Sequence, residues 1–152
     1  MALFGGLGCL PDLDVLGFTY HIPYAGQFGH RGASHSLTVA VVAGVLSALV
    51  FGGRGRSRLR MGLTAVATVA SHGFLDAMTD GGLGVAFFWP FSQQRFLFPW
   101  RPIPVAPIGA AFFTHRGFAV FLSELAIFAP FLIYALWPRT VHRAGLEALD
   151  DA

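Results

Sequence analysis

The stretch from residue 36 to 78, SLTVAVVAGVLSALVFGGRGRSRLRMGLTAVATVASHGFLDAM, decides the fold class of this chain. It contains two apolar runs, residues 36–51 and 61–78, separated by a short segment rich in glycine and arginine. As helices at ~1.5 Å per residue, these runs reach about 24–27 Å, slightly less than a hydrocarbon core of ~30 Å. Short helices of this kind predict a small bundle that thins the bilayer locally.

The composition of the whole chain favours a membrane protein. Of the 152 residues, 55% are hydrophobic and only 12% are charged, which is about half the charged fraction of a soluble domain. That is too little charge to cover a soluble surface, and so apolar a chain cannot remain disordered in water. A third apolar run, residues 118–137, is long enough to span the bilayer although Pro130 interrupts it.

The remaining segments complete the predicted architecture. The first ten residues, MALFGGLGCL, are too short to span and lack the basic start of a signal peptide. A run of prolines from Pro90 to Pro107 forbids a helix within residues 80–117, where Phe and Trp predict a loop in the interfacial region. We therefore expect an all-α, polytopic bundle of about three spans plus a partial N-terminal helix. Residues 1–138 would form one domain, and residues 139–152 a polar cytoplasmic tail.

Arginine placement predicts the orientation in an inner (cytoplasmic) membrane. Four arginines lie between the first two runs and two follow the third, namely Arg54, Arg56, Arg58, Arg60, Arg139 and Arg143. Basic loops remain on the cytoplasmic side. Residues 1–35 and 80–117 would then lie at the outer face. The single Cys9 excludes a disulfide framework and a cysteine-based zinc site.

Two groups of polar residues precede the first span. Asp12 and Asp14 are alternate carboxylates that can face one cation, although a simple turn explains them better when they are taken alone. His30 and His35 could converge on a metal, with Ser34 as the N-cap of the helix and Arg31 available for an anionic phosphate group. A polar loop that anchors the helix is an equally good explanation of this second group.

Two further groups lie inside the apolar runs, where ionisable side chains are costly. His72 and Asp76 are four residues apart, so a helix presents both on one face. They could form a buried hydrogen bond between helices, but the cost of desolvation favours a functional site. Glu124 lies about two turns into the third run and is either a site residue or a neutral, hydrogen-bonded glutamate.

These groups are predicted to lie at one depth, near the outer face. A set of His, Asp and Glu side chains without cysteine suits zinc, or alternatively manganese or iron. His21, His115 and His142 are isolated, and we expect them to be interfacial or solvated.

The same residues carry a resemblance to a known family. LPDLD (residues 10–14), HRGASHS (30–36), SHGFLDAMTDGG (71–82), WPFSQQRF (89–96) and SEL (123–125) occur in this order. The chain resembles the YdjM-like family of bacterial inner-membrane proteins, which are described as metal-dependent hydrolases. The resemblance covers residues 7–137. Its combination of motifs is specific, although each motif alone is weak.

The resemblance implies a metal site together with nearby polar residues. The implied ligands are Asp12, Asp14, His30, His35, His72 and Asp76, and the nearby residues are Arg31, Ser36, Thr79 and Arg95. Family members usually begin with a further apolar helix carrying a Thr-His pair. Here residues 1–10 correspond to the end of that helix, and its histidine is absent.

The expected function is hydrolysis at the bilayer interface by metal-activated water, on a phosphoester of a lipid or another amphiphile. Asp76 or Glu124 would act as general base, and Arg31 and Arg95 would stabilise an anionic transition state. The alternatives are a non-catalytic or ion-handling protein with a structural or transport metal site, and an amidase- or ceramidase-like hydrolase. We expect no nucleic-acid partner, and the short spans favour a homo-oligomer.

Overall fold

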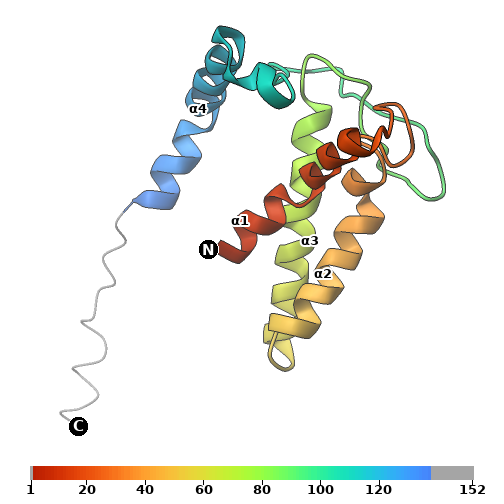
Figure 1. Ribbon diagram of the computed structural model, residues 1–152. Coiled ribbons are helices and arrows are strands. Elements are labelled where there is room, and N and C mark those ends of the chain that lie inside the picture. Colours follow the sequence, from red (N-terminus) through yellow and green to blue (C-terminus); the bar gives the residue numbers. More distant parts are fainter. Residues whose placement is uncertain (1, 138–152) are drawn as a thin grey trace.

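The computed structural model describes residues 2–137 and is helical throughout its regular parts (Figure 1). The predicted tail of residues 139–152, with Arg139, His142 and Arg143, lies outside the described residues. The α-helices are α1 (Ala2–Cys9), α2 (Leu37–Phe51), α3 (Arg56–Ala77) and α4 (His115–Leu136), and the 3-10 helices are η1 (Pro11–Tyr20), η2 (Ala33–His35) and η3 (Gly109–Phe113). Within residues 2–137 the β-structure is limited to two isolated bridges. The prediction of an all-α fold is confirmed.

Helices α2 and α3 form a hairpin and lie side by side (Figure 1). They approach closely because Gly44 has no side chain: a Cβ at this position would lie 2.9 Å from the carbonyl oxygen of Gly62 and would clash with Val66. Buried Ala40 and Val69 contribute to a small core in the same hairpin. Helix α1 packs against α3 and adds apolar side chains to that core.

The start of α2 differs from the prediction. Ser36, not Ser34, is the N-cap, since its hydroxyl accepts a hydrogen bond of 3.2 Å from the backbone N–H of Val39. The Ser34 hydroxyl instead donates to a carboxylate oxygen of Asp14. The sequence offered two serines two residues apart; the 3-10 turn η2 contains Ser34 and ends directly before Ser36.

The segment between α3 and η3 has no helix, as its prolines predict, but it forms more than a surface loop. It buries Val85 and Phe87 against Ala77 at the end of α3 and is flanked by Leu37 at the start of α2. The backbone N–H of Leu37 donates to the carbonyl of Phe87 over 3.0 Å. This second core fixes the loop over the ends of α2 and α3, where the polar residues gather.

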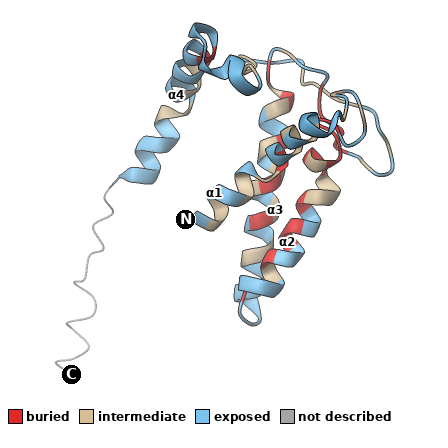
Figure 2. Cartoon of the chain, in the orientation of Figure 1, coloured by how far each residue is buried: buried red, intermediate tan, exposed pale blue. Residues whose placement is uncertain are grey.

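Helix α4 stands apart from the other three α-helices (Figure 1) and packs on η3. Most of its surface is exposed (Figure 2). Among residues 2–137, α4 is the one helix long and apolar enough to cross a membrane by itself. Helices α1 and η1 could form a second span with a 47° bend, whereas α2 is apolar but has only 15 residues. The expectation of three spans is therefore not confirmed.

Candidate metal centre

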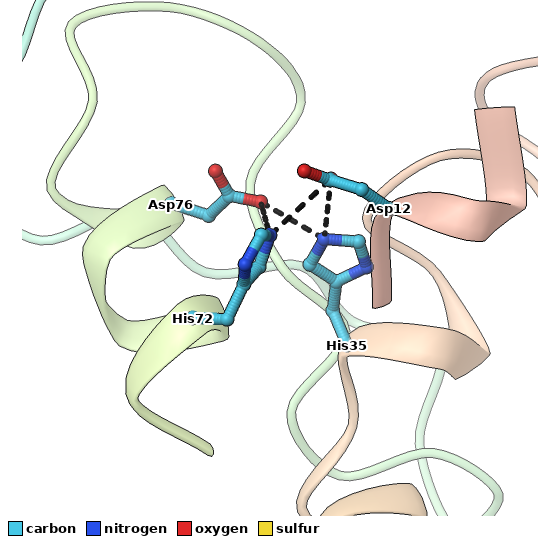
Figure 3. A group of neighbouring side chains, drawn as sticks. All are labelled: Asp12, His35, His72 and Asp76. Carbon is cyan, nitrogen blue, oxygen red and sulfur yellow. Dashed lines mark ion pairs between the residues drawn. The ribbon is translucent and has the colours of Figure 1, made fainter. Parts of the chain in front are cut away.

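Three separate segments bring four side chains to one point (Figure 3). Asp12 comes from η1, His35 from η2, and His72 and Asp76 from α3. The spacing of four residues places His72 and Asp76 on one face of α3, as predicted. One ligand atom from each of the four side chains lies within 4.8 Å of all the others. We call these four residues the inner cluster.

Nitrogen and oxygen atoms alternate in the inner cluster. Nε2 of His35 lies 3.0 Å from Oδ2 of Asp76 and 3.6 Å from Oδ1 of Asp12. Nε2 of His72 lies 3.2 Å from Oδ1 of Asp12 and 3.8 Å from Oδ2 of Asp76. Two imidazoles and two carboxylates thus surround one common position, which is a donor set suited to zinc.

The atoms that face this position lack hydrogen bonds. Within residues 2–137, His35 Nε2, His72 Nε2 and Asp76 Oδ2 are buried and make no hydrogen bond, although they form the ion pairs given above. Buried polar atoms normally have a partner, because leaving one unsatisfied costs about 1–3 kcal/mol. Three such atoms around one point are what a coordinating cation would satisfy, so the residues present fit a metal ion.

A second layer of polar residues lies behind His35. Its Nδ1 lies 3.0 Å from the Ser34 hydroxyl and 3.2 Å from Oδ2 of Asp14. Because the Ser34 proton is donated to Asp14, the Ser34 oxygen can only accept from Nδ1. In the neutral ring Nδ1 therefore carries the proton and Nε2 offers its lone pair to the inner cluster.

His30 belongs to this second layer, since its Nδ1 lies 2.7 Å from Oδ1 of Asp14. The His30 ring also packs edge-on against Tyr24, with the ring centroids 5.4 Å apart. The six ligands implied by the sequence thus fall into two groups that share His35, the inner cluster and the set formed by Asp14, His30 and His35. The first group contains the three buried atoms that lack a hydrogen bond among the described residues, although they form ion pairs with one another.

The charge of the carboxylates dominates the inner cluster. Burial lowers the pKa of His35, whose ring is almost inaccessible, but Asp12, Asp14 and Asp76 outweigh that effect and raise the pKa to about 10. The site therefore holds positive charge strongly. A proton on His35 would meet that demand in part, and a divalent cation would meet it more fully.

Arg31 contacts the inner cluster from behind. Its Nη2 donates to Oδ1 of Asp76 over 3.1 Å, and its Nη1 donates to the Thr79 hydroxyl over 2.8 Å and to the carbonyl of Gly81 over 3.1 Å. Only 4% of the Arg31 surface is exposed.

Arg95 lies apart from the inner cluster. Among residues 2–137, the acceptors of its guanidinium are the backbone carbonyls of Tyr24, Gly26, His30 and Gly84. These bonds join the loop around residues 24–30 to the loop around residue 84, so the contacts of Arg95 fit a structural role. Its expected contact with a transition state remains a prediction.

A cavity of about 530 Å³ opens beside the inner cluster. Its polar side includes Asp12, His72 and Asp76, and Glu124 of α4 lines it as well. An apolar wall of this cavity was not predicted, because it comes mainly from the proline-rich segment, η3 and α4: Ile103, Ala106, Pro107, Ile108, Phe112 and Phe128. The alternation of proline with aliphatic residues from 102 to 108 is the one sequence signal that could have indicated this wall.

These features define a class of protein: an all-helical chain with a long apolar helix and a His/Asp cluster suited to a metal. Comparison with known proteins then gives the family. The chain matches the family model described as YdjM inner membrane protein over residues 1–144, and it belongs to that family. A relative, inner membrane protein YbcI of Escherichia coli (strain K12), is 43% identical over 129 residues, covering 81% of this chain and 73% of that protein. No solved structure is detectably similar to the chain.

Proposed function

We propose that this inner membrane protein is a metal-dependent hydrolase that cleaves a phosphoester of a lipid or another amphiphile at the bilayer interface. The observation that carries this proposal is the convergence of His35 Nε2, His72 Nε2 and Asp76 Oδ2, all buried and without hydrogen bonds, beside a cavity of about 530 Å³.

Asp12, His35, His72 and Asp76 would hold the metal, for which we propose zinc. A zinc ion held there would supply its usual chemistry, which is to lower the pKa of bound water towards ~7. Manganese or iron would be the alternatives for this donor set.

Glu124 is the better placed of the two predicted general bases. Oδ1 of Asp76 is already bonded to Arg31, and Oδ2 faces the inner cluster. Glu124 lines the same cavity from α4, and within the described residues its carboxylate makes no hydrogen bond or ion pair. It can therefore accept a proton from a water molecule in the cavity.

The apolar wall supports an amphiphilic substrate. Ile103, Ile108 and Phe128 line the same cavity as the charged residues, so one ligand would meet both kinds of surface. A charged ester group would lie against the inner cluster, and a hydrocarbon part would lie against the wall, where its burial is favourable.

We also propose that α2 and α3 cross the membrane with α4, and that the site faces outward. The outer surface of α2 supports this, since Val42, Leu46 and Val50 are more than half exposed and would contact lipid. The basic turn between α2 and α3 lies at the end of the hairpin remote from the inner cluster (Figure 1). Basic turns remain cytoplasmic, which supports an outer-face position for the cluster.

Metal analysis tests the proposal first. The protein purified in detergent without added metal is expected to retain about one or two equivalents of a divalent metal, in line with mono- and dinuclear hydrolase sites. His72→Ala removes one inner ligand and should lower metal affinity by more than ~100-fold. Even the loss of a residue that only hydrogen-bonds to a ligand lowers metal affinity by ~10–100-fold. His115→Ala, at an exposed histidine at the start of α4, is the matched control and should retain the metal.

A substrate screen then distinguishes the kinds of bond. Phospholipid vesicles, ceramide in detergent and a soluble aryl phosphate are each incubated with wild type, His72→Ala and His115→Ala. The proposal expects release of a phosphorylated headgroup or phosphate by wild type and the control only. Metal retained without turnover of any of these would favour a structural metal site. Turnover of ceramide alone would indicate an amidase.

A further inference from the structure

The backbone of Arg31 adopts an unfavourable conformation directly beside the inner cluster. Its φ is +62°, in the left-handed region that residues other than glycine seldom occupy. Strained backbone of this kind persists only where the surrounding contacts hold it firmly. The reason for the strain therefore has to be found in the contacts of Arg31.

Two backbone contacts fix this conformation. The N–H of Arg31 donates to Oδ2 of Asp14 over 3.2 Å, and its carbonyl accepts from the N–H of Ala86 over 3.1 Å. Asp14 is the carboxylate next to Nδ1 of His35. The backbone of Arg31 thus holds the residue that orients one inner histidine.

The side chain of Arg31 holds an inner carboxylate. Nη2 donates to Oδ1 of Asp76, which leaves Oδ2 as the oxygen that faces His35 and His72. Nη1 is bonded to Thr79 and Gly81 and cannot turn away without losing these partners. The guanidinium fits here because Gly82 has no side chain, and a Cβ there would lie 2.8 Å from Nη1.

This arrangement does not suit the role that the sequence suggested for Arg31. Both terminal nitrogens donate to protein acceptors, and the remaining Nε is buried. Arg31 lines the cavity, but with Nη1 committed to Thr79 and Gly81 and Nε buried, its guanidinium offers no free pair of N–H groups for bidentate binding of an anionic group.

We infer that Arg31 is a positioning residue: it holds Asp76 through its side chain and Asp14 through its backbone, and so presents Asp76 Oδ2 and His35 Nε2 to one metal ion. Asp76 would then bind the metal through one oxygen only. This inference rests on the proposed metal site, and the experiment below separates its failure from that of the proposed function.

The test measures metal binding by full-length protein in detergent. Wild type, Arg31→Gln, Arg31→Lys and Arg95→Gln are stripped of metal and titrated with Zn²⁺ against a chelator and with Co²⁺ by visible absorption. Arg95→Gln is the matched control, because it also removes an arginine bonded to backbone carbonyls but does not touch the inner cluster.

We expect Arg31→Gln to weaken Zn²⁺ binding by ~10–100-fold, the usual effect of losing a partner that orients a ligand. Its Co²⁺ spectrum should change, because Asp76 is free to bind through both oxygens. Arg31→Lys keeps the charge and should lose less affinity. Arg95→Gln should lower the melting temperature but leave the affinity and the spectrum of the folded protein unchanged.

Wild-type affinity and an unchanged Co²⁺ spectrum in Arg31→Gln would overturn the inference while leaving the proposed function intact. Failure of the wild type itself to bind either metal would overturn both. If Arg31→Gln does not fold, Thr79→Val removes one acceptor of Nη1; it also removes the bond from the Thr79 hydroxyl to the backbone carbonyl of Asp76, but no contact to the Asp76 carboxylate. A smaller loss of affinity with the same spectral change supports the inference, and no change in either contradicts it.

Discussion

Asp14 lies behind a histidine of the inner cluster, where a carboxylate would orient that histidine towards a metal. It accepts from the Ser34 hydroxyl and from the backbone N–H of Arg31, and it lies 2.7 Å from Nδ1 of His30 and 3.2 Å from Nδ1 of His35. These contacts fix the ring of His35, whose other nitrogen faces the inner cluster. Carboxylates placed behind metal-binding histidines act in this way in many proteins.

Replacing Asp14 tests this role. Asp14→Asn keeps the size of the side chain but removes the charge that stabilises the His30 and His35 rings, so Zn²⁺ affinity should fall by about 10–100-fold. Chelator competition measures this change. Asp80→Asn is the matched control, since Asp80 accepts from the backbone N–H of Val105, away from the inner cluster. Equal affinities in the two variants would contradict the role of Asp14.

The sequence could predict which residues form this site better than it could predict which of their atoms face one another. The spacing of His72 and Asp76 specifies one helix face, and a scarcity of charge makes each ionisable residue conspicuous. Which histidine nitrogen faces inward depends on ring orientation and on hydrogen bonds between distant segments. The commitment of Arg31 to Asp76 likewise depends on a backbone conformation that residue type did not indicate.

At the scale of elements, the close approach of α2 and α3 is the feature most sensitive to mutation. At Gly44 a Cβ would overlap Val66 and crowd the backbone of Gly62, so the two helices would have to move apart. Ser36 and Ala77 lie at the end of this hairpin where α2 begins and α3 ends, next to the residues of the site. Its packing therefore supports the geometry of the inner cluster.

Gly44→Ala is expected to lower stability by about 1–3 kcal/mol, as overpacking does elsewhere. Thermal unfolding in detergent, followed by circular dichroism, measures the effect. Gly6→Ala in α1 is the control, because a Cβ there meets nothing within 4 Å and alanine favours the helix by ~0.5–1 kcal/mol. A Gly44→Ala protein as stable as Gly6→Ala would show that the helices are not in close contact.

The helices themselves were largely predictable, because long apolar runs bounded by helix-breaking residues specify them. The run at residues 36–51 corresponds to α2 (Leu37–Phe51), and the run at 118–137 corresponds to α4 (His115–Leu136). Helix α3 begins earlier than its apolar run, at Arg56, since arginine is a good helix former and hydropathy does not mark its boundary. The position of α4, apart from the hairpin, depends on the loop and was not predictable from periodicity.

At the scale of the whole molecule, the proposed orientation places the turn after α2 and the site on opposite sides of the membrane. In a Cys9→Ser background, Gln94→Cys should react with a membrane-impermeant maleimide applied to spheroplasts. Ser57→Cys should react only after the membrane is permeabilised, because basic turns stay inside. Both positions are exposed in the structure, so neither is shielded by the fold. Labelling of both from the same side would contradict the three-span arrangement.

Helix α4 contributes to the wall of the cavity but to none of the four inner ligands, and it is joined to the rest mainly through η3. The four residues that would bind the metal are therefore carried by other segments than α4, which carries the proposed base Glu124 and part of the wall that would contact the substrate. Such a division lets a lineage alter its choice of substrate by diverging in one helix, while the residues around the metal remain under separate constraint. It also marks α4 as the segment to exchange between relatives when new specificities are sought.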